Sequence, residues 1–138
     1  MSVFVLDTNT ISFYLKEDRY VIDNIENALL SGDELLIAPI AYYEVRRGLL
    51  AINSEKRILK FKRLCQLFPV GQFDNHILDI AADIYVELRN TGRLMNDADI
   101  FIAAFCKQHG FALVTNNNKH FKNVSGLSLF DWTLSSNN

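Results

Sequence analysis

The chain has 138 residues, of which 49% are hydrophobic, and its formal net charge is −2. This length suits one domain with a hydrophobic core, and the composition excludes a disordered chain. The near-neutral charge excludes a protein that binds nucleic acid through a basic surface overall, although it does not exclude a local basic patch.

Short apolar segments alternate with helical segments along the chain. In chain order we predict a strand at 3–6, helices at 8–15 and 21–30, a strand at 35–38, helices at 39–50 and 55–67, a short strand at 70–73, helices at 75–90 and 98–109, and strands at 111–114 and 127–130. This alternation predicts an α/β fold in which helices cover both faces of a parallel sheet. We place one domain at 1–134 and expect 135–138 to be a flexible tail.

Acidic side chains stand where predicted strands end or where the neighbouring helices begin. Asp7 follows the first strand, Glu44 lies in the helix after the second, and Asp97 and Asp99 open the helix before strand 111–114. A parallel sheet brings such positions to one edge, where carboxylates repel one another unless a cation neutralises them. Oxygen ligands suit Mg²⁺ or Mn²⁺, ions that assist phosphodiester hydrolysis. The pattern therefore predicts metal-assisted phosphodiester hydrolysis.

Each of these acids also has a plainer structural interpretation. Asp7 is a suitable N-cap for the helix that follows it, and Glu44 fits a solvated position on a helix. Asp97 also suits an N-cap, whereas Asp99 suits a capping box with Asn96. Residue by residue both interpretations stay open, and only the shared location at strand exits favours a site.

Five sequence blocks follow one another in a fixed order over residues 4–132. They are LDTN, YYEVRRG, NDADIFIAAF, LVTNNNKHF and GLSLFDW. Together they resemble the PIN-domain family and, more narrowly, the VapC-type toxins of bacterial toxin–antitoxin pairs. The resemblance implies a three-layer α/β/α sandwich with a mostly parallel sheet. It also implies a Mg²⁺-dependent endoribonuclease toxin, with Mn²⁺ as the alternative ion and tRNA or rRNA as the substrate.

The resemblance also assigns roles to individual residues. It implies that Asp7, Glu44 and Asp99 are catalytic and bind metal, with Asp97 as an added ligand. At the place where many family members carry a fourth acid this chain has Asn116 or Asn117, and an amide adds no charge. Side chains expected to orient ligands or contact the phosphate are Thr8, Asn9, Thr115, Asn116 and Asn117.

Basic residues are concentrated between positions 46 and 63, where seven Lys or Arg face one acid, Glu55. Positive charge of this kind is needed to bind backbone phosphates, but a solvated helix face explains it equally well. The candidates for RNA contact are Arg46, Arg47, Lys56, Lys60, Arg63 and Lys119.

The resemblance implies three partners: an RNA substrate, a small VapB-like antitoxin whose C-terminal segment covers the acidic site, and a second copy of the chain in a homodimer. No segment has the length of a membrane span or the pattern of a signal peptide, so we expect a cytoplasmic protein. Cys65 and Cys106 lack metal-ligand spacing and are expected to be free, buried thiols.

Two other function classes stay open. The chain fits a non-catalytic PIN-like module that binds RNA or protein, and it fits a PIN endonuclease that processes RNA without being a toxin. A phosphatase of the haloacid dehalogenase type is disfavoured, because it needs a second Asp where this chain has Asn9. A dinucleotide-binding domain is disfavoured because no GxGxxG turn occurs.

Overall fold

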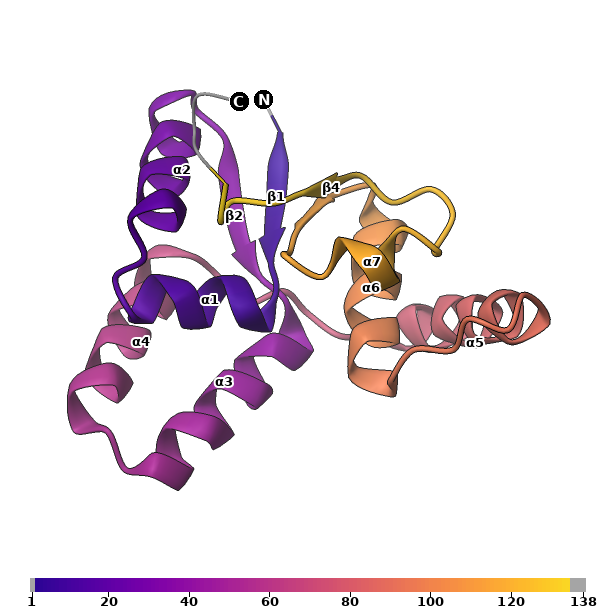
Figure 1. Cartoon of the computed structure of the whole chain (residues 1–138), viewed down its shortest axis with the longest axis horizontal. Coiled ribbons are helices and arrows are strands. Elements are labelled where there is room, and N and C mark those ends of the chain that lie inside the picture. The colour runs from indigo at the N-terminus through magenta and orange to yellow at the C-terminus, as the bar shows by residue number, and fades with distance from the viewer. Residues whose placement is uncertain (1, 135–138) are drawn as a thin grey trace.

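The computed structural model describes residues 2–134, and four short strands form one sheet within them (Figure 1). The strands lie in the order β2-β1-β3-β4, and every pairing is parallel. Their bounds are β1 Val3–Leu6, β2 Glu34–Ile37, β3 Ala112–Val114 and β4 Leu129–Phe130. Leu6 is in register with both Ile37 and Val114, so the carboxyl ends of three strands are level.

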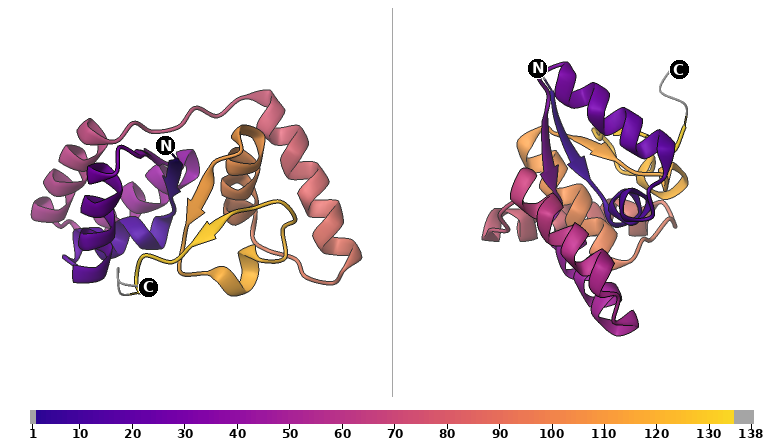
Figure 2. Two further views of the ribbon diagram at one scale, coloured as in Figure 1. Left: turned by 90° about the horizontal axis from the view of Figure 1, so that it is seen from above. Right: turned by 90° about the vertical axis from the view of Figure 1, so that its left-hand side faces the viewer.

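Seven helices of the described range surround this sheet. They are α1 Thr8–Leu15, α2 Arg19–Leu30, α3 Pro39–Ile52, α4 Glu55–Leu67, α5 Asn75–Asn90, α6 Asp97–His109 and α7 Asn118–Phe121. Helices α1 and α2 lie on one side of the sheet and α6 on the other, with α5 packed against α6 (Figure 2). Helices α3 and α4 form a hairpin that extends beyond the sheet (Figure 1). The predicted three-layer sandwich is confirmed.

Local signals in the sequence explain most helix boundaries. The side chains of Asp18, Ser54 and Asp74 accept hydrogen bonds from backbone N–H groups in the first turns of α2, α4 and α5. Pro39 opens α3, where its missing N–H costs nothing. Gly110 ends α6 with a φ of 69°, a conformation that side chains with a Cβ rarely adopt.

The predicted strand at 70–73 is wrong. Within this segment only Val70 pairs, through a single parallel bridge to Ile37. Hydrogen bonds from Ile37 N to Pro69 O and from Gly71 N to Ile37 O hold this bridge, after which the chain leaves the sheet. Gly71 lies so close to the Phe105 ring that a Cβ there would overlap it. The segment therefore packs against α6 directly after this single bridge.

Other differences are smaller. The strand predicted at 127–130 is restricted to Leu129–Phe130, and the short helix α7 has no counterpart among the predicted elements. Ala38 belongs to the N-cap of α3 rather than to β2. Both cysteines are free, with Cys106 buried and Cys65 partly buried. The predicted tail at 135–138 lies outside the described residues, and none of the helices within residues 2–134 is long and apolar enough to span a membrane.

Candidate active site

The candidate site begins at the level carboxyl ends of β1, β2 and β3. Asp7 follows Leu6 directly, and Thr115 follows Val114 in the neighbouring strand. The backbone N–H of Asp7 donates to Val114 O at 3.1 Å, and the Thr10 hydroxyl donates to the same carbonyl at 3.0 Å. These bonds fix the start of α1 against β3 and so fix the position of the Asp7 side chain.

Asp7 is both a helix cap and a buried carboxylate. Its Oδ1 accepts the Thr10 N–H at 2.9 Å, and the residue is only 5% exposed. Burial raises the pKa of Asp7, although hydrogen bonds from Thr115 and Thr10 oppose this shift; the nearby charge of Asp99 adds to the rise. Asp7 is therefore an N-cap, as the capping interpretation predicts. Capping alone does not explain why the carboxylate is buried or why a second acid lies near it.

Glu44 is held by residues on both sides of it. The Thr8 hydroxyl donates to Glu44 Oε1 at 2.7 Å, which joins the start of α1 to α3. Arg47, one turn further along α3, lies with its Nη2 3.8 Å from Glu44 Oε2. The pairing with Arg47 expected of a solvated helix residue is present, but Glu44 is mostly covered and is tied to the segment that carries Asp7.

Asp99 lies in the first turn of α6, which Asn96 caps. Asn96 Oδ1 accepts the Asp99 N–H at 2.9 Å, and Asn96 Nδ2 donates to Asp99 Oδ2 at 3.1 Å. The expected pairing of Asp99 with Asn96 is confirmed. Burial raises the pKa of Asp99, and the negative charge of Glu44 raises it further, against the lowering effects of Asn96 and His120.

Three carboxylates from distant parts of the chain therefore influence one another. Asp99 raises the pKa of Asp7, and Glu44 raises the pKa of Asp99. Asp97 lies elsewhere: it is exposed and lines a groove between α5 and α6 with Tyr85. Within residues 2–134, no group of three His, Cys, Asp or Glu side chains is arranged to hold a metal ion. Hydrogen bonds inside the protein engage one oxygen each of Asp7, Glu44 and Asp99.

The amides after β3 form their own contacts. Asn9 Nδ2 donates to Asn116 Oδ1 at 3.2 Å, so the first turn of α1 is joined to the segment that follows β3. The Thr115 hydroxyl accepts the Asn117 N–H at 2.9 Å. These two contacts arrange the polar residues around Asp7 without adding a negative charge at positions 116 and 117.

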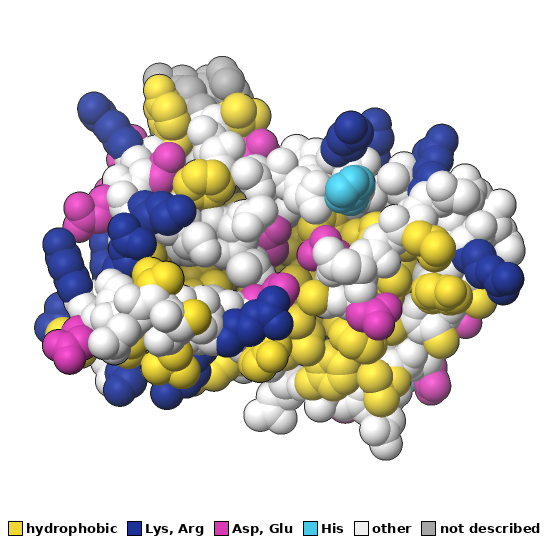
Figure 3. Space-filling model, turned by 60° about the horizontal axis from the view of Figure 1, so that its bottom comes forward, with side chains coloured by type: hydrophobic (Ala, Val, Ile, Leu, Met, Phe, Trp, Pro, Cys, Tyr) yellow, Lys and Arg dark blue, Asp and Glu magenta, His cyan; other side chains and the backbone are white. Residues whose placement is uncertain are grey.

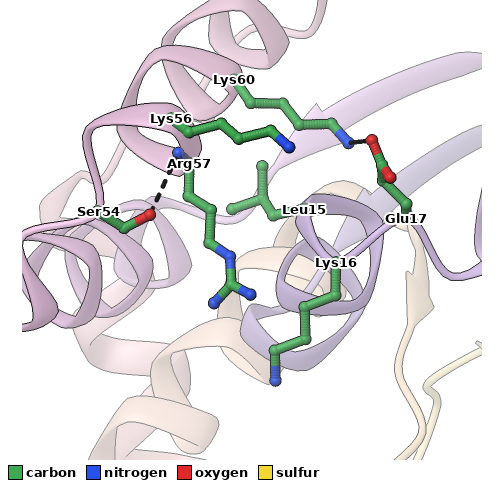
Figure 4. Close-up of a pocket in the computed structure, with 7 residues that line it drawn as sticks. All are labelled: Leu15, Lys16, Glu17, Ser54, Lys56, Arg57 and Lys60. Carbon is green, nitrogen blue, oxygen red and sulfur yellow. Dashed lines mark hydrogen bonds and ion pairs between the residues drawn. The ribbon is translucent and has the colours of Figure 1, made fainter.

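Two of the six predicted RNA-contact residues, Lys56 and Lys60, line the same hollow. A hollow of about 200 Å³, here called the basic hollow, is lined by 15–17 at the end of α1 and by Ser54, Lys56, Arg57 and Lys60 of α4 (Figure 4). Arg63 does not line this hollow, and Lys119 is exposed on α7. Two basic residues outside the predicted set, Lys16 and Arg57, belong to the basic hollow.

A second hollow of about 230 Å³, here called the adjoining hollow, lies between the basic hollow and Glu44. It shares Leu15, Lys16 and Arg57 with the basic hollow and reaches Thr8 and Glu44. Figure 3 shows acidic side chains near the middle of this face and Lys and Arg side chains around the α3–α4 side. Sequence spacing does not reveal the role of Lys16, because it stands far along the chain from the other basic residues.

A family model for the PIN domain matches residues 4–127, a range that contains every acid discussed above. The chain belongs to the PIN-domain family. Within this family it is similar to Ribonuclease VapC1 of Methanocaldococcus jannaschii, with 30% identity over 94% of this chain and 88% of that protein. It is also similar to the tRNA(fMet)-specific endonuclease VapC of Shigella flexneri, with 26% identity over 96% of this chain and 100% of that protein.

Solved structures of PIN-domain proteins give the same result. The structure of VapBC-1 from nontypeable Haemophilus influenzae matches with a TM-score of 0.82 and 27% identity, over 96% of this chain and 99% of that chain. Because these matches run along almost the whole chain, the sheet edge that carries Asp7, Glu44 and Asp99 is part of the shared PIN-domain fold rather than an addition to it.

Proposed function

We propose that this PIN-domain protein is a metal-dependent endoribonuclease and the toxin of a type II toxin–antitoxin pair. One observation supports the proposal above all others: Asp7, Glu44 and Asp99 come from distant parts of the chain, yet their charges act on one another at the end of the sheet. The similarity of the chain to VapC ribonucleases supports the same reaction.

The donor set suits a hard divalent cation, Mg²⁺ or Mn²⁺. The ligands available are carboxylate oxygens, and burial with mutual repulsion raises the pKa of both Asp7 and Asp99. Asp7, Asp99 and Glu44 would hold the cation, with Asp97 as a more distant carboxylate. A cation held there supplies charge stabilisation for the phosphodiester and increases the acidity of water.

The chain's own side chains would position the reactants. Thr8 holds Glu44 Oε1, and Arg47 lies 3.8 Å from Oε2, so the carboxylate is held in a position from which it would orient the attacking water and accept its proton. Hydrogen bonds from Thr10 and Thr115 fix the Asp7 carboxylate, and the hydrogen-bonded amides of Asn9 and Asn116 add polar groups nearby. Water would then attack the phosphorus in line as the bond from phosphorus to the 3′ oxygen breaks. The leaving 3′ oxygen would take a proton from solvent, which gives 3′-hydroxyl and 5′-phosphate ends.

The substrate and partner follow from the same family. The VapC endonuclease of Shigella flexneri is named for tRNA(fMet), so we propose tRNA as the first substrate to test and rRNA as the second. The structural relatives include VapBC complexes, so we propose a VapB-like antitoxin whose C-terminal segment covers the acids, and a homodimer that builds the complex.

Cleavage of total RNA in Mg²⁺ and in EDTA tests the proposal. We expect wild type to cut in Mg²⁺ only, and Asp7→Asn to lose cleavage, since Asn keeps the cap oxygen but not the charge. Glu44→Gln should lower kcat by about 100-fold or more, the usual contribution of a positioned general base. Equal cleavage by wild type and Asp7→Asn would reject the active site and would favour a non-catalytic module or a different nuclease.

Expression in cells tests the biological role separately. Wild type alone should stop growth, whereas Asp7→Asn alone, or wild type with the product of a short reading frame beside its gene, should not. A protein that cuts RNA in the tube but leaves growth unchanged would indicate an RNA-processing nuclease rather than a toxin. Sequencing of RNA ends after induction would identify the target.

A further inference from the structure

The basic hollow has a charge opposite to that of the whole chain. Four of the residues that line it, Lys16, Lys56, Arg57 and Lys60, are basic, and only Glu17 is acidic. The formal net charge of the chain is nevertheless −2. Positive charge is therefore gathered locally in a concave surface, where low-dielectric walls strengthen its attraction for anions.

Among the residues that the structure describes, only one of the four cations has a counter-charge. Lys60 Nζ lies 3.3 Å from Glu17 Oε1 and 5.3 Å from the centre of the Tyr14 ring, so both contacts fix its position. Within residues 2–134, the side chains of Lys16, Lys56 and Arg57 form no hydrogen bond or ion pair. Three cations without a counter-charge therefore line one hollow, and an anion placed there would relieve the repulsion among them.

The basic hollow borders the adjoining hollow, which reaches Glu44, one of the proposed catalytic acids. Leu15, Lys16 and Arg57 line both hollows, and the adjoining hollow continues to Thr8 and Glu44. In Figure 4 the side chains of Lys16 and Arg57 extend toward the same side of the hollow, with Leu15 between them. A chain-like ligand that occupies the basic hollow can therefore continue to the acids along one depression.

We propose that the basic hollow binds a backbone phosphate of the RNA strand away from the bond that is cut, with Lys16 and Arg57 as positioning residues where the two hollows meet. This inference rests on the proposed function, since it assigns a second contact to the same substrate. Arg57 offers a planar fork that fits two phosphate oxygens, and Lys16 adds a mobile point charge. Such contacts position a strand without reading its sequence.

An equilibrium binding experiment in EDTA separates this inference from catalysis. A labelled single-stranded RNA is titrated with wild type, with the double variant Lys16→Gln/Arg57→Gln, and with the control Arg89→Gln/Lys107→Gln. The control likewise removes one Arg and one Lys charge, but from exposed positions on α5 and α6 that line neither hollow. Circular dichroism and Tm confirm that all three proteins fold.

We expect the double variant to bind RNA about 10-fold more weakly. The slope of log Kd against log salt should fall by about 0.7, because Lys16 and Arg57 together hold one phosphate and each phosphate contact on a single strand contributes about 0.7. The control should bind as wild type does. In cleavage assays KM should rise with kcat little changed, and Lys16→Arg should retain wild-type binding because it keeps the charge.

Three results would overturn the inference: no saturable RNA binding by wild type, equal weakening by the double variant and the control, or an unchanged salt slope in the double variant. Loss of antitoxin binding with RNA binding intact would assign the hollow to an acidic protein segment instead. Failure of the proposed function looks different, because a protein that does not cut RNA would still show the charge-dependent binding in EDTA.

Discussion

The hydroxyl of Thr8 donates a 2.7 Å hydrogen bond to Glu44, joining the first residue of α1 to the second turn of α3. These two residues are 36 positions apart in the chain. The bond holds the Glu44 carboxylate toward the end of β1, where Asp7 lies, rather than leaving it to Arg47 alone. Thr8 thus holds Glu44 beside the proposed catalytic acids, which makes it a candidate positioning residue.

Replacing Thr8 by Val should slow catalysis while the fold stays intact. Val keeps the branched shape but cannot donate to Glu44, so the carboxylate loses its fixed orientation, and we expect kcat to fall about 10-fold. Loss of one partly buried hydrogen bond should lower the free energy of unfolding by about 1 kcal/mol. Thr8→Ser keeps the hydroxyl and serves as the control; if Val and Ser variants have equal kcat, Thr8 does not position Glu44.

Replacing Asp7 by Asn should stabilise the protein at neutral pH in EDTA. Burial raises the pKa of Asp7 in the folded protein above its ordinary value of 3.8, so the ionised carboxylate opposes folding. In wild type this opposition is absent below pH 3.8 and grows as the pH rises toward the folded-state pKa, above which it is constant. Urea unfolding of both proteins across this pH range measures the difference.

The two curves should converge at low pH, where Asp7 is protonated in both the folded and the unfolded state. Above the folded-state pKa of Asp7, the free energy of unfolding of the Asn variant should exceed that of wild type by a constant amount. Mg²⁺ should raise the Tm of wild type and leave the Asn variant unchanged, since ion binding to the folded state is stabilising. A difference that does not depend on pH would show that burial of the charge is not its cause.

Replacing Asp99 should reduce RNA cleavage much more than replacing Asp97, although the two residues are only two positions apart. Asp99 interacts with Glu44 and Asp7, whereas Asp97 is exposed in the groove beside α5. We expect Asp99→Asn to lose activity by about 100-fold or more, and Asp97→Asn to stay within about threefold of wild type. Activity measured against Mg²⁺ concentration tests this, and an equal loss in both variants would place Asp97 among the metal ligands.

Gly71 is required by close packing rather than by its backbone angles. A Cβ at position 71 would overlap the Phe105 ring, so Gly71→Ala should destabilise the fold by about 1–3 kcal/mol. At Gly48, in the middle of α3, no described atom of another segment lies within 4 Å of the place that a Cβ would take, and Gly48→Ala should stabilise by about 0.5–1 kcal/mol. Urea denaturation compares the free energies of unfolding of the two variants. If Gly71→Ala is as stable as wild type, the Phe105 ring can move aside to make room for the Cβ. In that case adding Phe105→Leu to Gly71→Ala should change the free energy of unfolding little.

Much of the fold follows from local patterns in the sequence. Apolar β-branched runs indicate β1, β2 and β3, and side-chain caps such as Ser54 and Asn96 indicate where helices begin. The short elements are harder to predict. Strand β4 has only two residues, and α7 has four, so each depends on packing that no local periodicity encodes.

The candidate site shows the same division. The strand exits of a parallel sheet meet at one edge, which points to Asp7, Glu44, Asp97 and Asp99, and the resemblance to the PIN-domain family favours Asp99 over Asp97. In the structure Asp99 raises the pKa of Asp7, and Glu44 raises that of Asp99. The basic residues behave differently. Sequence proximity groups Arg63 with Lys60, but only Lys60 of these two lines the basic hollow, and Lys16 joins it from the end of α1.

The sequence by itself determined the order of the longer strands and helices and the acids that stand at strand exits, because periodicity, caps and strand exits are local or one-dimensional signals. Only the tertiary structure decided which side chains hold those acids and which cations share a hollow. The hydrogen bond from Thr8 to Glu44 and the convergence of Lys16 with Arg57 depend on how α1 packs against α3 and α4. Such distances are set by the packing of the whole core, and no spacing along the chain contains them.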